Sequence, residues 1–152
     1  MLKETIENPS CRIIESFSAD DTHELGIRFG REAEPGSVYT LEGDLGAGKT
    51  VFAKGFAEGL GISENVTSPT FTIMQIYEGG RIPLYHYDAY RIEDPSEMEE
   101  IGYTDYFYGD GACLIEWACN IEEFLPEHIT RISVERDNEK GFDYRKITVT
   151  NI

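Results

Sequence analysis

The sequence predicts an α/β fold, with a mostly parallel β-sheet, some antiparallel strands and flanking helices. Two observations support this prediction. Short runs rich in β-branched and aromatic residues alternate with segments whose apolar residues recur at helical spacing. A glycine-rich loop also connects one such run to a helical segment, as in many parallel sheets. The chain has 152 residues, of which 40% are hydrophobic, so we expect one domain over residues 1–152 that buries its own core.

The first predicted elements are a strand and a long helix. Residues 11–17 alternate loosely between apolar and polar side chains and predict the first strand. Ser18 is a suitable N-cap, and two aspartates soon after it suit the positive end of a helix dipole. The helix would continue to about residue 34, because Pro35 and Gly36 then end the pattern.

The glycine-rich loop lies between a second strand and a second helix. Residues 38–42 are rich in strand-forming side chains. Beyond the loop, Phe52, Phe56 and Leu60 recur at helical spacing until Gly61. The loop consists of Gly43, Asp44, Leu45, Gly46, Ala47, Gly48, Lys49 and Thr50.

A β-hairpin is predicted next. Two β-rich runs, residues 71–77 and 82–87, flank Gly79 and Gly80, which favour a tight turn. Pro83 has no backbone N–H, so the second strand would begin late or lie at a sheet edge there.

The last third of the chain predicts one helix and three strands. Residues 95–101 form a short acidic segment that begins with proline, which suits the first turn of a helix. Residues 112–116 are apolar and end in an acid, as a buried parallel strand would. Residues 129–135 and 144–150 predict two final strands joined by a polar turn.

The glycine-rich loop matches the pattern G-x-x-x-x-G-K-[ST], and we call it the phosphate-loop motif (residues 43–50). Its glycines let successive backbone N–H groups point at phosphates. Lys49 would place an ammonium against the outer phosphates, and Thr50 would offer a hydroxyl to Mg²⁺. In its strand–loop–helix setting the motif predicts a P-loop NTPase-like fold that binds a nucleoside triphosphate with magnesium.

Such a site also needs an acid that holds magnesium from a neighbouring strand end. Asp88 follows one β-rich run and Glu116 ends another. Each pattern alone is more typical of a surface acid, but beside a phosphate loop at least one acid should line the site. Thr70 is a candidate γ-phosphate sensor, with a simple polar turn as the alternative.

Two neighbours of these acids are interpreted as structural residues. His86 has no second ligand at metal spacing, so we interpret it as a structural histidine. Trp117 is interpreted as a packing residue, with contact to nucleotide or partner as the alternative.

Composition limits the possible partners. The net charge is −16 and lysines and arginines do not cluster, so direct, tight binding to nucleic acid is not expected. The acidity serves solubility or docking to a basic protein. Three cysteines without a C-x-x-C pair predict neither a zinc site nor a disulfide framework. Nothing approaches the roughly 18 apolar residues of a membrane span, and the N-terminus lacks a signal-peptide pattern. We therefore expect a cytoplasmic protein.

The sequence resembles the TsaE family, the small P-loop ATPases of bacterial tRNA threonylcarbamoyladenosine biosynthesis. The resemblance extends from about Ser18 to the final hairpin. One departure is residues 118–120, where many members carry a proline, and it would alter a turn. Four blocks in series carry the resemblance, namely residues 43–50, 67–71, 86–91 and 115–117.

What the resemblance implies is a partner-activated ATPase. Such proteins bind ATP, in preference to GTP, with Mg²⁺. They associate with TsaD, which transfers the threonylcarbamoyl group, and with its paralogue TsaB. They hydrolyse ATP appreciably only in that assembly, where hydrolysis resets the transferase. The modified adenosine lies beside the anticodon of the tRNA.

The resemblance also implies roles for individual residues. The backbone of residues 43–48 would cradle the phosphates, and Lys49 would stabilise the β- and γ-phosphates. Thr50 and Glu116 would ligate magnesium, and Asp88 would orient the attacking water. Lys49, Asp88 and Glu116 are thus the expected catalytic residues, with the division of labour between the two acids left open. The remaining implied contacts are Thr70 at the γ-phosphate and the backbone of Ala19 at the adenine.

Two other functions share the phosphate-loop motif. A small-molecule kinase would need an acceptor pocket and a lid with several arginines, and the sequence indicates neither. A non-catalytic interaction module would use the nucleotide only to stabilise a docking surface.

Overall fold

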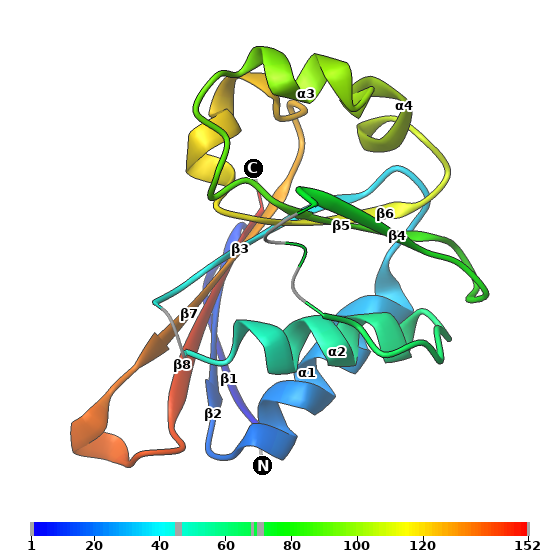
Figure 1. Ribbon diagram of the computed structural model, residues 1–152. Coiled ribbons are helices and arrows are strands. Elements are labelled where there is room, and N and C mark those ends of the chain that lie inside the picture. Colours follow the sequence, from blue (N-terminus) through cyan, green and yellow to red (C-terminus); the bar gives the residue numbers. More distant parts are fainter. Residues whose placement is uncertain (1, 45–46, 68, 70–71, 152) are drawn as a thin grey trace.

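The computed structural model describes residues 2–44, 47–67, 69 and 72–151. Over these residues one β-sheet forms the middle layer, with helices on both of its faces (Figure 1). Its eight strands are β1 (Lys3–Asn8), β2 (Cys11–Ser16), β3 (Val38–Glu42), β4 (Met74–Tyr77), β5 (Leu84–Asp88), β6 (Ala112–Glu116), β7 (Thr130–Arg136) and β8 (Arg145–Asn151). The helices are α1 (Ala19–Glu32), α2 (Lys49–Gly59), α3 (Ser96–Glu100), α4 (Tyr103–Phe107) and the 3₁₀ helices η1 (Ala118–Phe124) and η2 (Asn138–Lys140).

The centre of the sheet is parallel and its flanks are antiparallel. Across the sheet the strand order is β1-β2-β8-β7-β3-β6-β5-β4. β3 pairs in parallel with β6 and β7, and β5 pairs in parallel with β6. The outer pairs β4–β5, β7–β8, β2–β8 and β1–β2 are antiparallel. The predicted α/β fold, with a mostly parallel core and antiparallel additions, is confirmed.

Most predicted elements form close to their predicted bounds. The hydroxyl of Ser18 caps α1 by accepting a hydrogen bond from the Asp21 N–H at 3.1 Å. The predicted hairpin is β4–β5, and β5 begins directly after Pro83. The late start of this strand is therefore confirmed, but the edge position is wrong, because β5 lies between β4 and β6. The residue at which β4 was expected to begin, Phe71, lies outside the described residues.

Apart from the short 3₁₀ helices η1 and η2, two elements, β1 and α4, have no counterpart in the prediction. All six residues of β1 are exposed, so no apolar face marks this strand in the sequence. The segment at residues 11–17 is consequently the second strand of the sheet and not the first. α4 is five residues long, too short to show a helical period.

The helices cover the two faces of the sheet with separate cores. α1 and α2 pack on one face, and α3, α4 and η1 lie on the other (Figure 1). Among the described helices, none is long and apolar enough to cross a membrane. Cys113 is fully buried in β6, and this burial raises its pKa. The first core includes Leu25, Phe29, Phe52, Phe56 and Leu114, and the second includes Tyr87, Met98, Phe107, Ile115 and Ile121.

Glycines allow α1 and α2 to pack with their backbones in contact. A Cβ atom at Gly26 of α1 would lie 2.3 Å from the Phe52 carbonyl oxygen of α2. A Cβ at Gly55 of α2 would lie 2.1 Å from the His23 carbonyl oxygen of α1. Side chains at these positions would push the helices apart, because the atoms in the way belong to the backbone. This contact sets the distance between α1 and α2.

We predict that Gly55→Ala lowers the free energy of unfolding by about 2 kcal/mol. Overpacking typically costs about 1–3 kcal/mol, and the better helix propensity of alanine offsets at most about 1 kcal/mol. Urea denaturation followed by circular dichroism measures the change. Lys54→Ala, at an exposed position of the same helix, is the control and should change stability by less than about 0.5 kcal/mol. A Gly55→Ala protein as stable as the unmodified chain would contradict the packing argument.

Candidate functional site

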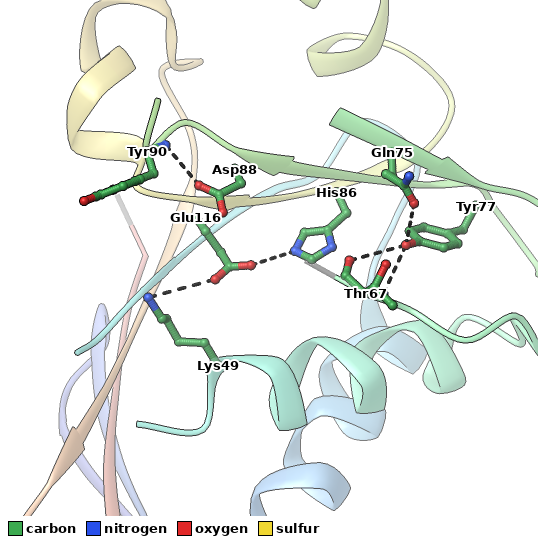
Figure 2. A network of polar contacts seen from close by, with 8 residues as sticks. All are labelled: Lys49, Thr67, Gln75, Tyr77, His86, Asp88, Tyr90 and Glu116. Carbon is green, nitrogen blue, oxygen red and sulfur yellow. Dashed lines mark hydrogen bonds and ion pairs between the residues drawn. The ribbon is translucent and has the colours of Figure 1, made fainter. Parts of the chain in front are cut away.

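The candidate site lies at the sheet edge where the parallel strands end. Asp88 is the last residue of β5, Glu116 is the last residue of β6, and the two are paired in register. His86, two residues before Asp88, lies on the same face of the sheet as Asp88. Both carboxylates are buried, with exposed fractions of 4% for Asp88 and 7% for Glu116. Figure 2 shows Glu116 and His86 between the strands and α2, from which Lys49 approaches.

The phosphate-loop motif connects the end of β3 to the start of α2. Gly48 is the N-cap of α2 and has a φ of +106°, in the left-handed region that favours glycine. Lys49 is the first residue of α2, and Thr50 follows it at an exposed position. The N–H groups at a helix N-terminus attract anions, so the segment is suited to bind phosphate. Leu45 and Gly46, also predicted to contact ATP, lie outside the described residues.

A chain of polar contacts joins the motif to the strand ends (Figure 2). Lys49 Nζ lies 3.9 Å from Glu116 Oε1, and Glu116 Oε2 lies 2.9 Å from His86 Nε2. Nδ1 of His86 is buried and has no hydrogen-bond partner in the part of the chain that the structure describes. A proton on Nε2, donated to Glu116, leaves no buried N–H unpaired on this ring. His86, interpreted from the sequence only as a structural histidine, thus bonds one oxygen of Glu116 while the other carboxylate oxygen faces Lys49.

Asp88 is held by a turn at the end of β5. Its Oδ1 accepts a hydrogen bond from the Tyr90 N–H at 3.0 Å (Figure 2). A bond from an aspartate to the N–H two residues later is typical of an Asx-turn. The Asp88 N–H in turn donates to the Ile73 carbonyl at 2.7 Å. These bonds position the Asp88 carboxylate at the strand end beside Glu116.

Trp117 is part of the site and not of the core. Its side chain is 41% exposed and its φ is +58°. Lys49 Nζ lies 5.3 Å from the centroid of its ring, within the range of a cation–π contact, and the Tyr90 ring centroid lies 4.8 Å away. The packing interpretation drawn from the sequence is wrong, because the chain turns at Trp117 and directs the ring toward Lys49. No local sequence signal marks this contact, since Lys49 and Trp117 are distant in the chain.

A pocket of about 400 Å³ adjoins the motif. Its lining includes Gly43, Asp44 and Lys49 of the motif, together with Trp117. A larger cleft of about 580 Å³ lies along α2 near His23 but includes no residue of the motif. We assign the site to the smaller pocket, because it contains Lys49 and adjoins Glu116, whereas the larger cleft is open and lacks both.

Ala19, predicted to border the adenine, lies beside the motif. It is the first residue of α1 and lines a hollow of about 50 Å³ together with Gly48, Val51 and Arg145. The tertiary structure thus brings Ala19 close to the start of α2, although Gly48 lies 29 positions further along the chain. Thr70, predicted to contact the γ-phosphate, lies outside the described residues.

The oxygen donors of the site fit magnesium. Over the described ranges, no three or more His, Cys, Asp or Glu side chains form a group that could hold a metal ion by themselves. Mg²⁺ sites in nucleotide-binding proteins typically use one or two carboxylates together with substrate phosphates and water. The buried Glu116 and Asp88 carboxylates, with the hydroxyl-bearing Thr50 in the first turn of α2, supply ligands of this kind.

Comparison with known proteins identifies the family. The family model described as "Threonylcarbamoyl adenosine biosynthesis protein TsaE" matches residues 16–147. The chain belongs to the TsaE family. It is 57% identical over 120 residues to the tRNA threonylcarbamoyladenosine biosynthesis protein TsaE of Bacillus subtilis, covering 79% of this chain and 73% of that protein. It is 48% identical over 119 residues to the tRNA threonylcarbamoyladenosine biosynthesis protein TsaE of Treponema pallidum, covering 78% of this chain and 87% of that protein.

A solved structure agrees with this TsaE assignment. The crystal structure of YdiB from Bacillus subtilis is similar to this chain with a TM-score of 0.78 and 43% sequence identity. The similarity covers 99% of this chain and 86% of that one. At this identity the match supports the P-loop NTPase-like α/β fold of this TsaE-family chain.

We predict that MgATP shifts the fluorescence emission of Trp117 to shorter wavelength, because a ligand in the pocket covers its half-exposed ring. Trp117 is the one tryptophan of the sequence, so it is the source of any tryptophan signal. Lys49→Ala should raise the MgATP concentration at half-change at least about tenfold, since a charge-assisted contact is lost. If MgATP causes no shift of the Trp117 emission, or if the unmodified chain and Lys49→Ala respond at the same MgATP concentration, the assignment of the pocket is contradicted.

Proposed function

We propose that this TsaE-family chain is a Mg²⁺-dependent ATPase required for threonylcarbamoyl modification of the adenosine next to the anticodon in tRNA. It acts in the cytoplasm through the TsaB–TsaD complex, which ATP hydrolysis resets. The observation that carries the proposal is the approach of Lys49, at the start of α2, to the buried carboxylate of Glu116. It places a phosphate-binding cation beside a candidate magnesium ligand, as nucleotide hydrolysis requires. The names of the relatives from B. subtilis and T. pallidum support the pathway.

The proposed mechanism depends on position and charge. The N–H groups around Gly48 and the ammonium of Lys49 bind the outer phosphates and neutralise the charge that develops on them. Thr50 and Glu116 hold magnesium, which when bound polarises the phosphate oxygens. Asp88, fixed by the Tyr90 N–H, orients the attacking water. His86 keeps the Glu116 carboxylate turned toward Lys49.

Partner activation is the second part of the proposal. Phosphoryl transfer is often accelerated by an arginine that a partner protein supplies. Arg91 is exposed on the segment after β5. At such a position we expect it to form a surface ion pair and not to contact phosphate. We therefore expect slow turnover by the isolated chain. The net charge of −16 favours action on protein partners, with the tRNA held elsewhere.

The direct test is ATP hydrolysis by the purified chain at fixed magnesium concentration, alone and with the TsaB–TsaD pair. We predict strong stimulation by the pair, because we expect a partner to supply part of the catalytic charge. Fast turnover without the pair would favour a self-sufficient enzyme such as a kinase. Absence of turnover with a pair shown to be active would favour the non-catalytic interaction module.

We predict that Asp88→Asn lowers partner-stimulated turnover about 10²- to 10⁴-fold, the range expected for loss of a group that handles the nucleophile. Asparagine keeps the oxygen that accepts from Tyr90, so MgATP affinity should change little. Asp94→Asn is the matched control, because exposed Asp94 makes the same kind of turn, accepting from the Ser96 N–H at 3.0 Å. Unchanged turnover would contradict this role of Asp88, whereas lost turnover with unaffected partner-dependent function would support the interaction module.

A further inference from the structure

Arg145 connects the last strand of the sheet to the phosphate-loop motif. It is the first residue of β8, and its Nε–H donates a hydrogen bond to the Ala47 carbonyl oxygen at 2.7 Å. The two residues are 98 positions apart in the chain. Its Nη1 donates to the carbonyl oxygens of Phe142 and Tyr144, each at 2.7 Å. The guanidinium thus bonds through Nη1 to the β7–β8 hairpin and through Nε to the phosphate-loop motif.

The bond to Ala47 determines the direction of a neighbouring N–H group. The Ala47 carbonyl and the Gly48 N–H belong to one planar, trans peptide unit, so they point in opposite directions. Arg145 draws the carbonyl toward β8, and the Gly48 N–H must therefore point away from β8. A cation on the carbonyl also polarises the peptide and strengthens its N–H as a donor.

The other peptide groups around Gly48 are held within the motif and α2. The Ala47 N–H donates to the Asp44 carbonyl at 3.0 Å, and the Gly48 carbonyl accepts from the Phe52 N–H at 3.0 Å. The Ala47–Gly48 peptide lies between these two fixed groups. Gly48 has no side chain to resist rotation of this peptide, so the bond from Arg145 is what restrains it.

Arg145 is itself fixed by the sheet. It is paired in register with Arg136 of β7 and with Ser16 of β2. The adjacent Tyr144 donates its hydroxyl proton to Glu15 Oε2 at 2.6 Å, which ties the base of the hairpin to β2. The donor that meets the motif therefore comes from a rigid element, as a positioning group requires.

We propose that Arg145 is a positioning residue for nucleotide binding, which holds the Ala47 carbonyl outward so that the Gly48 N–H faces the phosphates. The inference rests on the proposed function in one respect, that the anion is the phosphate chain of a nucleotide. It adds to that function a requirement for the β7–β8 hairpin, which contributes no residue to the motif itself.

The test compares Arg145→Met with Lys146→Met, which removes one cation from the next, exposed position of β8. The dissociation constant of MgATP, measured by calorimetry, should rise about tenfold in Arg145→Met and less than twofold in Lys146→Met. In the partner-stimulated assay KM should rise while kcat stays within twofold, because the Gly48 N–H contacts phosphate in both ground and transition states. Arg145→Lys, which keeps the charge but not the planar donor pair, should recover only part of the affinity.

Nuclear magnetic resonance of the nucleotide-free protein separates this inference from the proposed function. In the ¹⁵N-labelled unmodified chain, the Arg145 Nε–H should be protected from solvent exchange. The Gly48 amide resonance should move in Arg145→Met and stay in place in Lys146→Met. An unprotected Nε–H, or equal MgATP affinity in the two methionine variants, would overturn the positioning role. The predicted resonances in a chain that binds no MgATP would uphold the bond from Arg145 to the motif, but would overturn both its role in nucleotide binding and the proposed function.

Discussion

The parallel pairing of β3 with β6 is the constraint on which the candidate site depends. Leu41 near the end of β3 is in register with Glu116 at the end of β6. The chain leaves β3 into the phosphate-loop motif and returns as α2, so Lys49 emerges beside Glu116. Parallel strands end at one edge of a sheet, and for that reason the acids of β5 and β6 meet the motif there.

The motif is held from two sides by contacts that are far apart in the sequence. Below the sheet, α1 and α2 touch backbone to backbone at Gly26 and Gly55, which fixes how closely the two helices approach each other. From the antiparallel flank, Arg145 bonds to the carbonyl of Ala47. A chain of net charge −16 thus places two of its few cations at one loop, where they favour an anionic ligand over the repulsion of the surrounding acids.

Local sequence patterns predicted the elements well where those elements are buried. β3, β5 and β6 are almost wholly buried because both faces of the sheet are covered, and α1 has a capping serine and a proline stop. β1 and α4 went unpredicted because an exposed edge strand and a single short turn carry no periodic signal. Trp117 was misassigned for a different reason. Whether an aromatic ring packs inward or lines a pocket depends on the turn that follows β6 and on the neighbour that it meets.

The sequence by itself determined the phosphate-loop motif, its strand–loop–helix setting and the two acids at strand ends. These are properties of consecutive residues, since backbone conformation and side-chain period act over a few positions. Only the tertiary structure decided that Glu116 lies between Lys49 and His86, that Trp117 meets Lys49, and that Arg145 holds Ala47. Those contacts depend on which strands become neighbours and in which register, and the free energy that selects this order comes from burying both faces of the sheet at once.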